Sequence, residues 1–252
     1  MNIGAVGTGF NQTNYGAISS GKRINSAADD AAGLAQVNKL NTQSNGLNVG
    51  ASNAKDMDNL KKVSDGALSG INDYLQSIRE ASLKASNGLM TKSDKKAIQE
   101  EINGYLQGIN DIAENTTFNT RKILNEDGSM FTATGADGSG KEVATGNATL
   151  KALGLEGYDV TGDFDLSKVD SAIDKVNSMR SSDGAASNAL QRIYSYNMNT
   201  AENTTASSSR IEDLDMGAAI SEQKKNEVLD EYKNMMLRNQ MQQESLVTKM
   251  LK

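Results

Sequence analysis

Apolar residues recur every three or four positions between residues 54 and 81, a spacing that keeps them on one face of an α-helix. The stripe consists of Ala54, Met57, Leu60, Val63, Ala67, Ile71, Leu75, Ile78 and Ala81. It predicts a helix over about residues 51–86, which would extend roughly 50 Å at 1.5 Å per residue. A compact domain rarely holds so long an element, so we expect this helix to form one side of a rod.

A second, shorter helix is predicted after a turn at Asn87-Gly88. Thr91 and Asp94 have the spacing of an N-terminal capping pattern. Apolar positions then continue at helical spacing through Ala97, Ile98, Ile102, Leu106, Ile109 and Ile112. The two segments together predict a helical hairpin.

The N-terminal part of the chain is less regular. Residues 1–18 carry glycines among Asn and Thr, which favours a loose arm over a stable helix; these are Gly4, Gly7, Gly9 and Gly16. Ser26 and Asp29 form another capping pattern, which predicts that a helix starts at Ser26. We expect this helix to be interrupted between Gly46 and Gly50.

The middle of the chain, between about Leu124 and Asp165, is rich in Gly, Thr, Asp and Ser. Short β-prone pieces occur at residues 130–134 and 142–145. They predict small hairpins or loops.

Helical spacing resumes at Leu166 and continues towards Leu214, so this segment should return along the first rod. The pattern of residues 217–252 predicts a last amphipathic helix. The predicted fold is mainly α: an elongated antiparallel helical bundle or coiled-coil rod formed by the N- and C-terminal segments. A small β-hairpin or loop excursion lies in its middle.

Composition removes most enzyme mechanisms. The 252 residues include no Cys and no His, which excludes disulfides, thiolate chemistry, the commonest general base and the commonest metal ligand. No isolated acidic pair stands out for acid–base work. We therefore predict no enzyme activity, no catalytic residues, no cofactor and no metal.

Other features of the composition narrow the class of partner. Proline is absent, so helices can run without interruption. The net charge of −6, with Lys and Arg dispersed among acids, argues against a nucleic-acid partner. No apolar run approaches the roughly 18 residues of a membrane span, and residues 1–10 lack the pattern of a secretory signal. We expect neither a membrane nor a nucleic acid as partner.

Five short motifs resemble the bacterial flagellin family. They are Ser19–Leu34, Leu75–Glu80 (LQSIRE), Thr117–Asn119, Thr200–Asn203 (TAEN) and Ser209–Met216 (SRIEDLDM). The third resembles the family's Thr-x-Phe-Asn-Gly, with Thr120 in place of the glycine. Around these motifs, residues 19–130 and 166–252 are similar to the two terminal regions of flagellin.

The resemblance implies a structural subunit of the flagellar filament that self-assembles into a helical polymer. It also implies export through the flagellar secretion apparatus and a secreted location in the bacterial flagellum. Three regions are expected: a filament-core domain (1–44 and 217–252, its N-terminal part shortened), a helical rod domain (45–124 and 166–216) and a short variable β or loop region (125–165). Because the last region is small, we expect a nearly smooth filament.

The rod carries the first candidate partner surface. In many flagellins the surface around Leu-Gln-x-x-Arg-Glu is sensed by a Toll-like receptor, and a subunit contact is the other role expected there. The matching residues here are Leu75, Gln76, Ile78, Arg79 and Glu80, with Glu101 on the adjoining helix. Ser77 stands where receptor-active members commonly place a basic residue, so we expect weak receptor signalling.

The C-terminal helix carries the second candidate surface. Its adaptable apolar face is formed by Val228, Tyr232, Met235, Met236, Leu246 and Met250. The resemblance assigns this face to assembly with other subunits and to transient binding of the flagellar export chaperone.

Three alternatives stay open. The helix before Ser19 is shorter than in typical flagellins, so this subunit could build a modified inner tube or co-assemble as a minor subunit with a longer flagellin. A hook-filament junction protein shares the terminal pattern, although the continuous match through Leu251 favours a flagellin. A soluble helical immune ligand or binding module belongs to another class, and it would stay monomeric when seeded with filament fragments.

Overall fold

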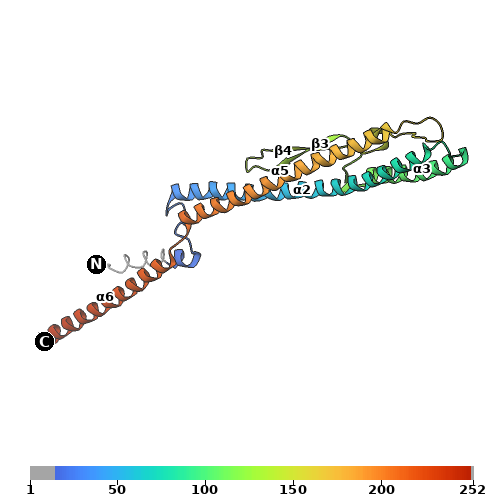
Figure 1. Ribbon diagram of the computed structural model, residues 1–252. Helices are drawn as coiled ribbons and strands as arrows, with labels where there is room; N and C mark the ends of the chain where they lie inside the picture. The colour runs from blue at the N-terminus through green and yellow to red at the C-terminus, as the bar shows by residue number, and fades with distance from the viewer. Residues whose placement is uncertain (1–14, 251–252) are drawn as a thin grey trace. The chain divides into compact units, whose positions relative to one another are not determined.

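Four long helices dominate the computed structural model. It describes residues 15–250, except for the side chains of residues 244, 245 and 247–250. The four helices are α2 (Ala31–Ala85), α3 (Lys92–Asn115), α5 (Ser167–Glu212) and α6 (Met216–Met250) (Figure 1). Side chains of α2 and α5 pack against each other, and small β-hairpins lie between α3 and α5 in the sequence. The predicted mainly α fold is confirmed.

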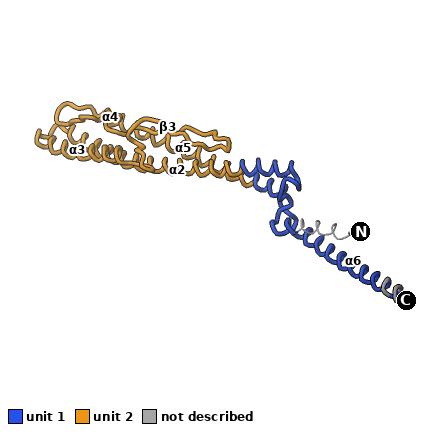
Figure 2. The backbone as a smooth tube through the Cα atoms, turned by 180° about the vertical axis from the view of Figure 1, so that it is seen from behind, with its two compact units in different colours: residues 1–42, 203–252 blue, residues 43–202 orange. Residues whose placement is uncertain are grey.

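The chain divides into two compact units (Figure 2). The first consists of Met1–Thr42 and Asn203–Lys252, and the second of Gln43–Glu202. Both α2 and α5 contribute residues to each unit. The functional domain boundaries expected from the sequence stay a prediction.

Helix α2 begins later than its capping pattern predicted. The Asp29 carboxylate does accept hydrogen bonds from Ser26, but this pair closes a turn ahead of the helix. The helix itself begins at Ala31, where Asp30 Oδ1 accepts from the backbone N–H of Gly33 at 2.8 Å. The predicted start at Ser26 is therefore wrong by five residues, because the next acidic residue serves as the cap.

The expected interruption between Gly46 and Gly50 is also wrong, since α2 is continuous through both. Another part of the chain instead packs against these glycines. A Cβ at Gly46 would lie 2.9 Å from the Cα of Ala136, and one at Gly50 would lie 2.7 Å from the carbonyl carbon of Thr134. The backbone after a β-strand packs directly against these two positions, where any side chain would overlap it. This contact explains why α2 carries glycines there without being interrupted.

That strand belongs to the larger hairpin, formed by β3 (Gly128–Ala133) and β4 (Gly140–Thr145) in antiparallel register from Gly128↔Thr145 to Ala133↔Gly140. Two amides fasten its turn to the long helices. Asn53 of α2 donates to the Ala133 carbonyl at 2.8 Å, and Asn197 of α5 donates to the Thr134 carbonyl at 2.7 Å. Hairpins were predicted here, but their attachment to the helices was not.

Two small elements lie beside this hairpin in the sequence. The strands β1 (Thr117–Phe118) and β2 (Arg121–Lys122) pair around Asn119 and Thr120, whose φ angles are +48° and +66°. Thr120 thus occupies a left-handed position that suits glycine, the residue found there in the family pattern. The short helix α4 (Leu150–Leu153), capped by Thr149, was not predicted.

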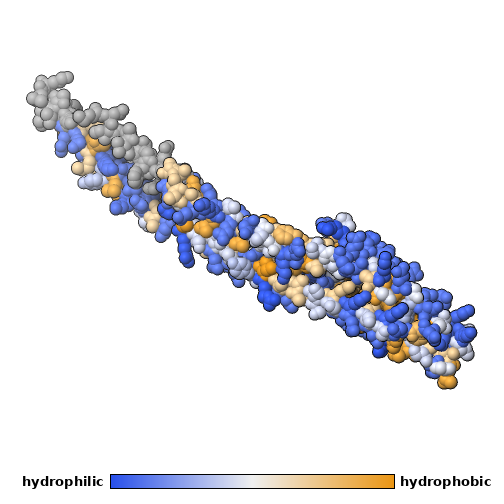
Figure 3. Space-filling view, turned by 90° about the horizontal axis from the view of Figure 1, so that it is seen from above, coloured by the Kyte–Doolittle hydropathy of each residue, from blue (hydrophilic) through white to orange (hydrophobic). Residues whose placement is uncertain are grey.

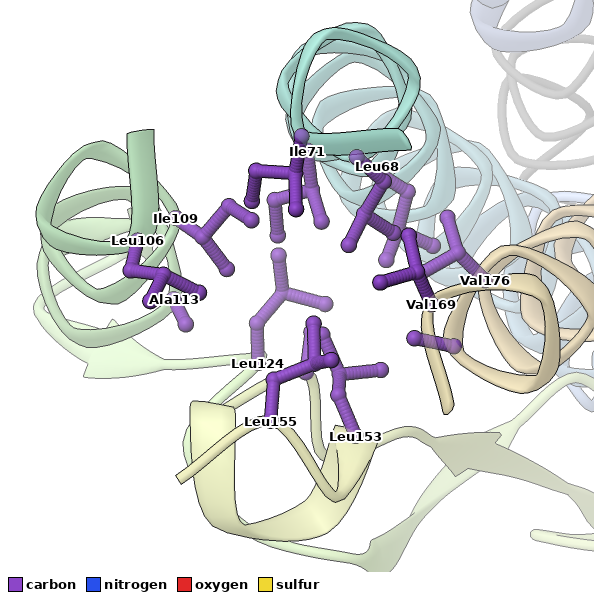
Figure 4. Packing of buried hydrophobic residues seen from close by; sticks show 14 of the residues in the cluster. Leu68, Ile71, Leu106, Ile109, Ala113, Leu124, Leu153, Leu155, Val169 and Val176 are labelled. Carbon is purple, nitrogen blue, oxygen red and sulfur yellow. The ribbon is translucent and has the colours of Figure 1, made fainter. Parts of the chain in front are cut away.

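The core of the second unit lies where α2, α3 and α5 meet the segments around α4 (Figure 4). Leu68 and Ile71 of α2 point towards Ile109 of α3 and towards Leu124 and Leu153 (Figure 4). All five are at most 2% exposed. The apolar stripe that predicted α2 therefore serves mainly to close this core.

The ends of the long helices agree with most of the sequence predictions. Thr91 and Asp94 form the predicted capping box at the start of α3. Residues 15–20 are helical, so the predicted absence of a helix is wrong for 15–18, while residues 1–14 lie outside the described residues. The last helix begins at Met216, one residue before the predicted start.

Candidate assembly surfaces

The two terminal flagellin-like motifs meet in the first unit. Residues 21–24 run antiparallel to residues 211–214, with a bridge between Lys22 and Asp213. The Arg23 N–H donates to the Glu212 carbonyl at 2.7 Å, and the Leu214 N–H donates to the Gly21 carbonyl at 2.9 Å. We call this pairing of residues 21–24 with 211–214 the terminal junction.

Side chains reinforce the terminal junction. Lys22 Nζ lies 2.6 Å from Glu212 Oε1, and Arg23 Nη2 donates to the Ile211 carbonyl at 2.6 Å. Ile24 is only 1% exposed, so the junction also has an apolar anchor. The two motifs, nearly 190 residues apart in the sequence, therefore form one structural feature.

The turn after the junction is held by Asp29. Backbone N–H groups of Ser26 and Asn25 and the Ser26 hydroxyl donate to its carboxylate, which lowers the pKa of Asp29 below its ordinary value of 3.8. The ionised form is thus the one that the fold prefers.

Helix α6 starts directly after the junction, where Asp215 Oδ1 accepts from the Ala218 N–H at 3.0 Å. Many of its large apolar side chains are exposed; these are Met216, Ile220, Val228, Leu229, Tyr232, Met235, Met236, Leu237, Met241 and Leu246. Figure 3 shows apolar residues interspersed with hydrophilic ones on the surface of the described part of the chain. Exposed apolar side chains that gather on one side of a helix mark interaction surfaces.

The predicted stripe on α6 is included in this set. Val228, Tyr232 and Met235 are between 60% and 64% exposed, and Met236 and Leu246 are about half exposed. They are spaced by helical turns, as a docking face requires. The side chain of Met250 lies outside the described residues.

The predicted surface on the rod splits into exposed and buried residues. Gln76, Arg79, Glu80 and Glu101 are exposed. Leu75 and Ile78 are fully buried in the core, so we do not carry forward the expectation that these side chains face a partner. Their position follows from the same apolar stripe that closes the core.

The exposed residues of this surface are partly engaged within the protein. Arg79 Nε donates to Asp170 Oδ1 of α5 at 2.7 Å, with both side chains about half exposed. The Tyr105 hydroxyl donates to Glu101 Oε1 at 2.8 Å, and this bond raises the pKa of Tyr105. The Ser77 hydroxyl donates to the Asp73 carbonyl of its own helix, so it offers no outward donor.

No group of three or more acidic side chains among the described residues is placed to hold a metal ion. None of the helices in residues 15–250 has the length and apolar character that a membrane span requires.

Sequence reasoning missed the terminal junction as a contact, although both of its halves were recognised as motifs. It also missed five exposed apolar residues of α6, namely Met216, Ile220, Leu229, Leu237 and Met241. Their apolar character was a usable signal, but they lie off the single stripe on which the prediction was based.

Comparison with known proteins agrees with this architecture. Residues 11–129 match the bacterial flagellin N-terminal helical region, and residues 166–250 match the bacterial flagellin C-terminal helical region. The Phase 1 flagellin of Salmonella naestved and the flagellin of Salmonella enteritidis are each 41% identical over 146 residues, which is 58% of this chain and 29% of the relative. The chain thus spans about three tenths of the length of these curated relatives.

A solved structure is similar as well. The crystal structure of Bacillus cereus flagellin superposes with a TM-score of 0.50 at 25% identity, covering 60% of this chain and 90% of that one. Both terminal helical regions and the fold agree, so the chain belongs to the bacterial flagellin family.

Proposed function

We propose that this protein is a structural subunit of the bacterial flagellar filament, secreted and located in the flagellum. The observation that carries the proposal is the exposed apolar face of α6, which starts directly at the junction of the two family motifs. Burying this face against other subunits would contribute about 25 cal/mol for each Å² of apolar surface removed from water. Contacts between unlike faces that do not close into a ring would propagate a helical polymer.

Each of the three expected regions has its own position in the proposed filament. In our proposal residues 1–44 and 217–252 form the filament core, and residues 45–124 and 166–216 form the rod around it. Residues 125–165 face outward. Because the β3–β4 hairpin is fastened to α2 and α5, the outward region adds little bulk, which supports a nearly smooth filament.

The direct test is seeded polymerisation. Purified protein is concentrated, seeded with sheared filaments and examined by negative-stain electron microscopy. Long uniform filaments are expected. Short caps on the seeds would indicate a junction protein, growth only with a longer flagellin would indicate a minor subunit, and persistent monomers would indicate a soluble binding module.

We also propose that the flagellar export chaperone covers α6 before assembly. The exposed methionines Met235 and Met236 offer it an adaptable apolar surface. The affinity of the chaperone for the full-length protein is measured by titration, and it should fall when Met235 is replaced by Asp. Unchanged affinity would mean that the chaperone binds elsewhere.

Recognition by a Toll-like receptor is expected to be weak. Gln76, Arg79, Glu80 and Glu101 would form the surface, but Arg79 is shared with Asp170 and Ser77 bonds its own helix. A Ser77→Arg variant would add a planar, multi-donor anchor. In a reporter-cell assay it should signal more strongly than the unmodified protein, and equal signalling would refute this role of Ser77.

A further inference from the structure

The turn between α2 and α3 contains Asn87-Gly88, one of three Asn-Gly pairs in the sequence beside Asn45-Gly46 and Asn103-Gly104. Asn-Gly pairs can undergo deamidation without an enzyme, provided that the backbone can bend towards the side chain. We propose that Asn87 is a site of spontaneous deamidation and that the fold protects the other two asparagines.

The reaction needs only water and a base. A base removes the proton of the Gly88 backbone nitrogen, which then attacks Cγ of Asn87 and forms the new N–Cγ bond. The Cγ–Nδ2 bond of Asn87 breaks, and Nδ2 takes a proton from water and leaves as ammonia. This forms a five-membered succinimide. Water then opens the ring at one of its two carbonyls, which leaves either aspartate or isoaspartate at position 87.

The turn places the reacting groups favourably. The Gly88 N–H has no hydrogen-bond partner among the described residues, so nothing holds the nucleophile back. The Leu89 N–H donates to Asn87 Oδ1 at 3.1 Å. A donor on this oxygen stabilises the negative charge that develops there when the nitrogen attacks Cγ. Asn87 is exposed and Leu89 is 89% exposed, so water reaches the site.

The other two pairs lie inside helices. Asn45-Gly46 lies within α2, more than three turns from either end, and Asn103-Gly104 is in the middle of α3. In a helix the backbone N–H of the glycine is bonded to the preceding turn, and the backbone is not free to bend towards Cγ. Gly46 is further confined by Ala136. Reaction there requires local opening of the helix.

The product would alter the turn. The Met90 N–H donates to the Asn87 carbonyl at 3.0 Å, and isoaspartate would lengthen the backbone at this point. The new carboxylate would also stand just beyond the C-terminal end of α2, where negative charge is unfavourable. We expect faster hydrogen exchange around residues 86–91, with the core of the second unit unchanged.

The test is peptide mapping by mass spectrometry of the full-length protein, incubated at mildly alkaline pH. Conversion at Asn87 should be at least about tenfold faster than at Asn45 and Asn103, because the latter two must first unfold locally. In concentrated urea the three rates should converge. Equal rates in the folded protein would overturn the proposal, as would a rate difference that persists in urea.

A Gly88→Ala variant provides the matched control. Gly88 has no positive φ, and among the described residues beyond its two chain neighbours no atom lies within 4 Å of a Cβ placed there, so the fold accepts alanine. The added methyl group hinders attack by the residue 88 nitrogen and should slow conversion at Asn87 alone. An unchanged rate in this variant would refute the succinimide route. None of these outcomes depends on polymerisation, so they are separate from the proposed function.

Discussion

Lys61 of α2 and Asp183 of α5 form an ion pair at 2.6 Å, with side chains that are only 2% and 8% exposed. The Lys61 ammonium also donates to the Ala144 carbonyl of β4. A single charged group thus joins both long helices and the hairpin. The second carboxylate oxygen, Asp183 Oδ2, is buried and has no hydrogen-bond partner among the residues that the structure describes.

Removing Asp183 should strongly destabilise the second unit. An Asp183→Ala variant leaves the Lys61 ammonium buried without its counter-ion, which typically costs about 3–5 kcal/mol. We expect the free energy of unfolding, measured by urea denaturation, to fall by this amount.

The half-exposed pair between Arg180 and Asp65 at 2.8 Å is the control. Asp65→Ala should cost no more than about 1 kcal/mol, because solvent screens this pair. A double Lys61→Met and Asp183→Leu variant should recover most of the loss. If Asp183→Ala and Asp65→Ala lowered the free energy of unfolding equally, the buried ion pair would matter no more to stability than the half-exposed one.

Two glycines of α2 should respond to alanine with opposite signs. At Gly66 no described atom outside the local helix backbone lies within 4 Å of an added Cβ, so Gly66→Ala should gain about 0.5–1 kcal/mol of helix stability. At Gly50 the Cβ would overlap the Thr134 carbonyl group, so Gly50→Ala should be destabilising. Thermal unfolding of both variants measures this, and a gain at Gly50 would contradict the close packing of the hairpin.

Thr120→Gly should stabilise the protein. A β-branched residue at a φ of +66° is strained, and glycine removes that strain for a net gain of up to about 1 kcal/mol. Asn119→Gly should gain less, since Asn tolerates the left-handed region better. Urea denaturation of both variants compares the two positions, and a loss of stability in Thr120→Gly would disprove the strain.

The capping box of α3 should make stability depend on pH in the acid range. The Thr91 side chain and backbone donate to the Asp94 carboxylate and lower its pKa below the ordinary value of 3.8. A lowered folded-state pKa stabilises the fold above the unfolded pKa, and this contribution is lost as the pH falls through the folded pKa. Melting temperatures should therefore fall below about pH 3.8, with a shallower fall in Asp94→Asn. An identical fall in both proteins would exclude Asp94 as a contributor.

Much of the fold could be predicted because its signals are local. The apolar stripe around Ile71 and the capping box at Thr91 each depend on a few neighbouring residues, and both predicted their helices. The break at Gly46 and Gly50 was predicted wrongly because the reason for these glycines is a contact with Thr134 and Ala136. Contacts so distant in the sequence leave no periodic trace.

The candidate surfaces could be predicted only in part. Leu75 and Arg79 belong to one recognised motif, yet the first is buried and the second exposed. A motif does not tell which of its residues close the core. The contact between Lys22 and Glu212 in the terminal junction could not be predicted either, because the presence of two motifs in one sequence does not show that they are in contact.

The critical concentration for seeded polymerisation tests the central claim most directly. Met235→Asp places a charge in the exposed apolar face of α6, while Asn234→Asp adds the same charge at an adjacent polar position. If α6 forms the filament core through this face, Met235→Asp should raise the critical concentration by about tenfold or more. Asn234→Asp should change it little. Filament growth by Met235→Asp at the concentration of the unmodified protein would contradict the proposed role of α6.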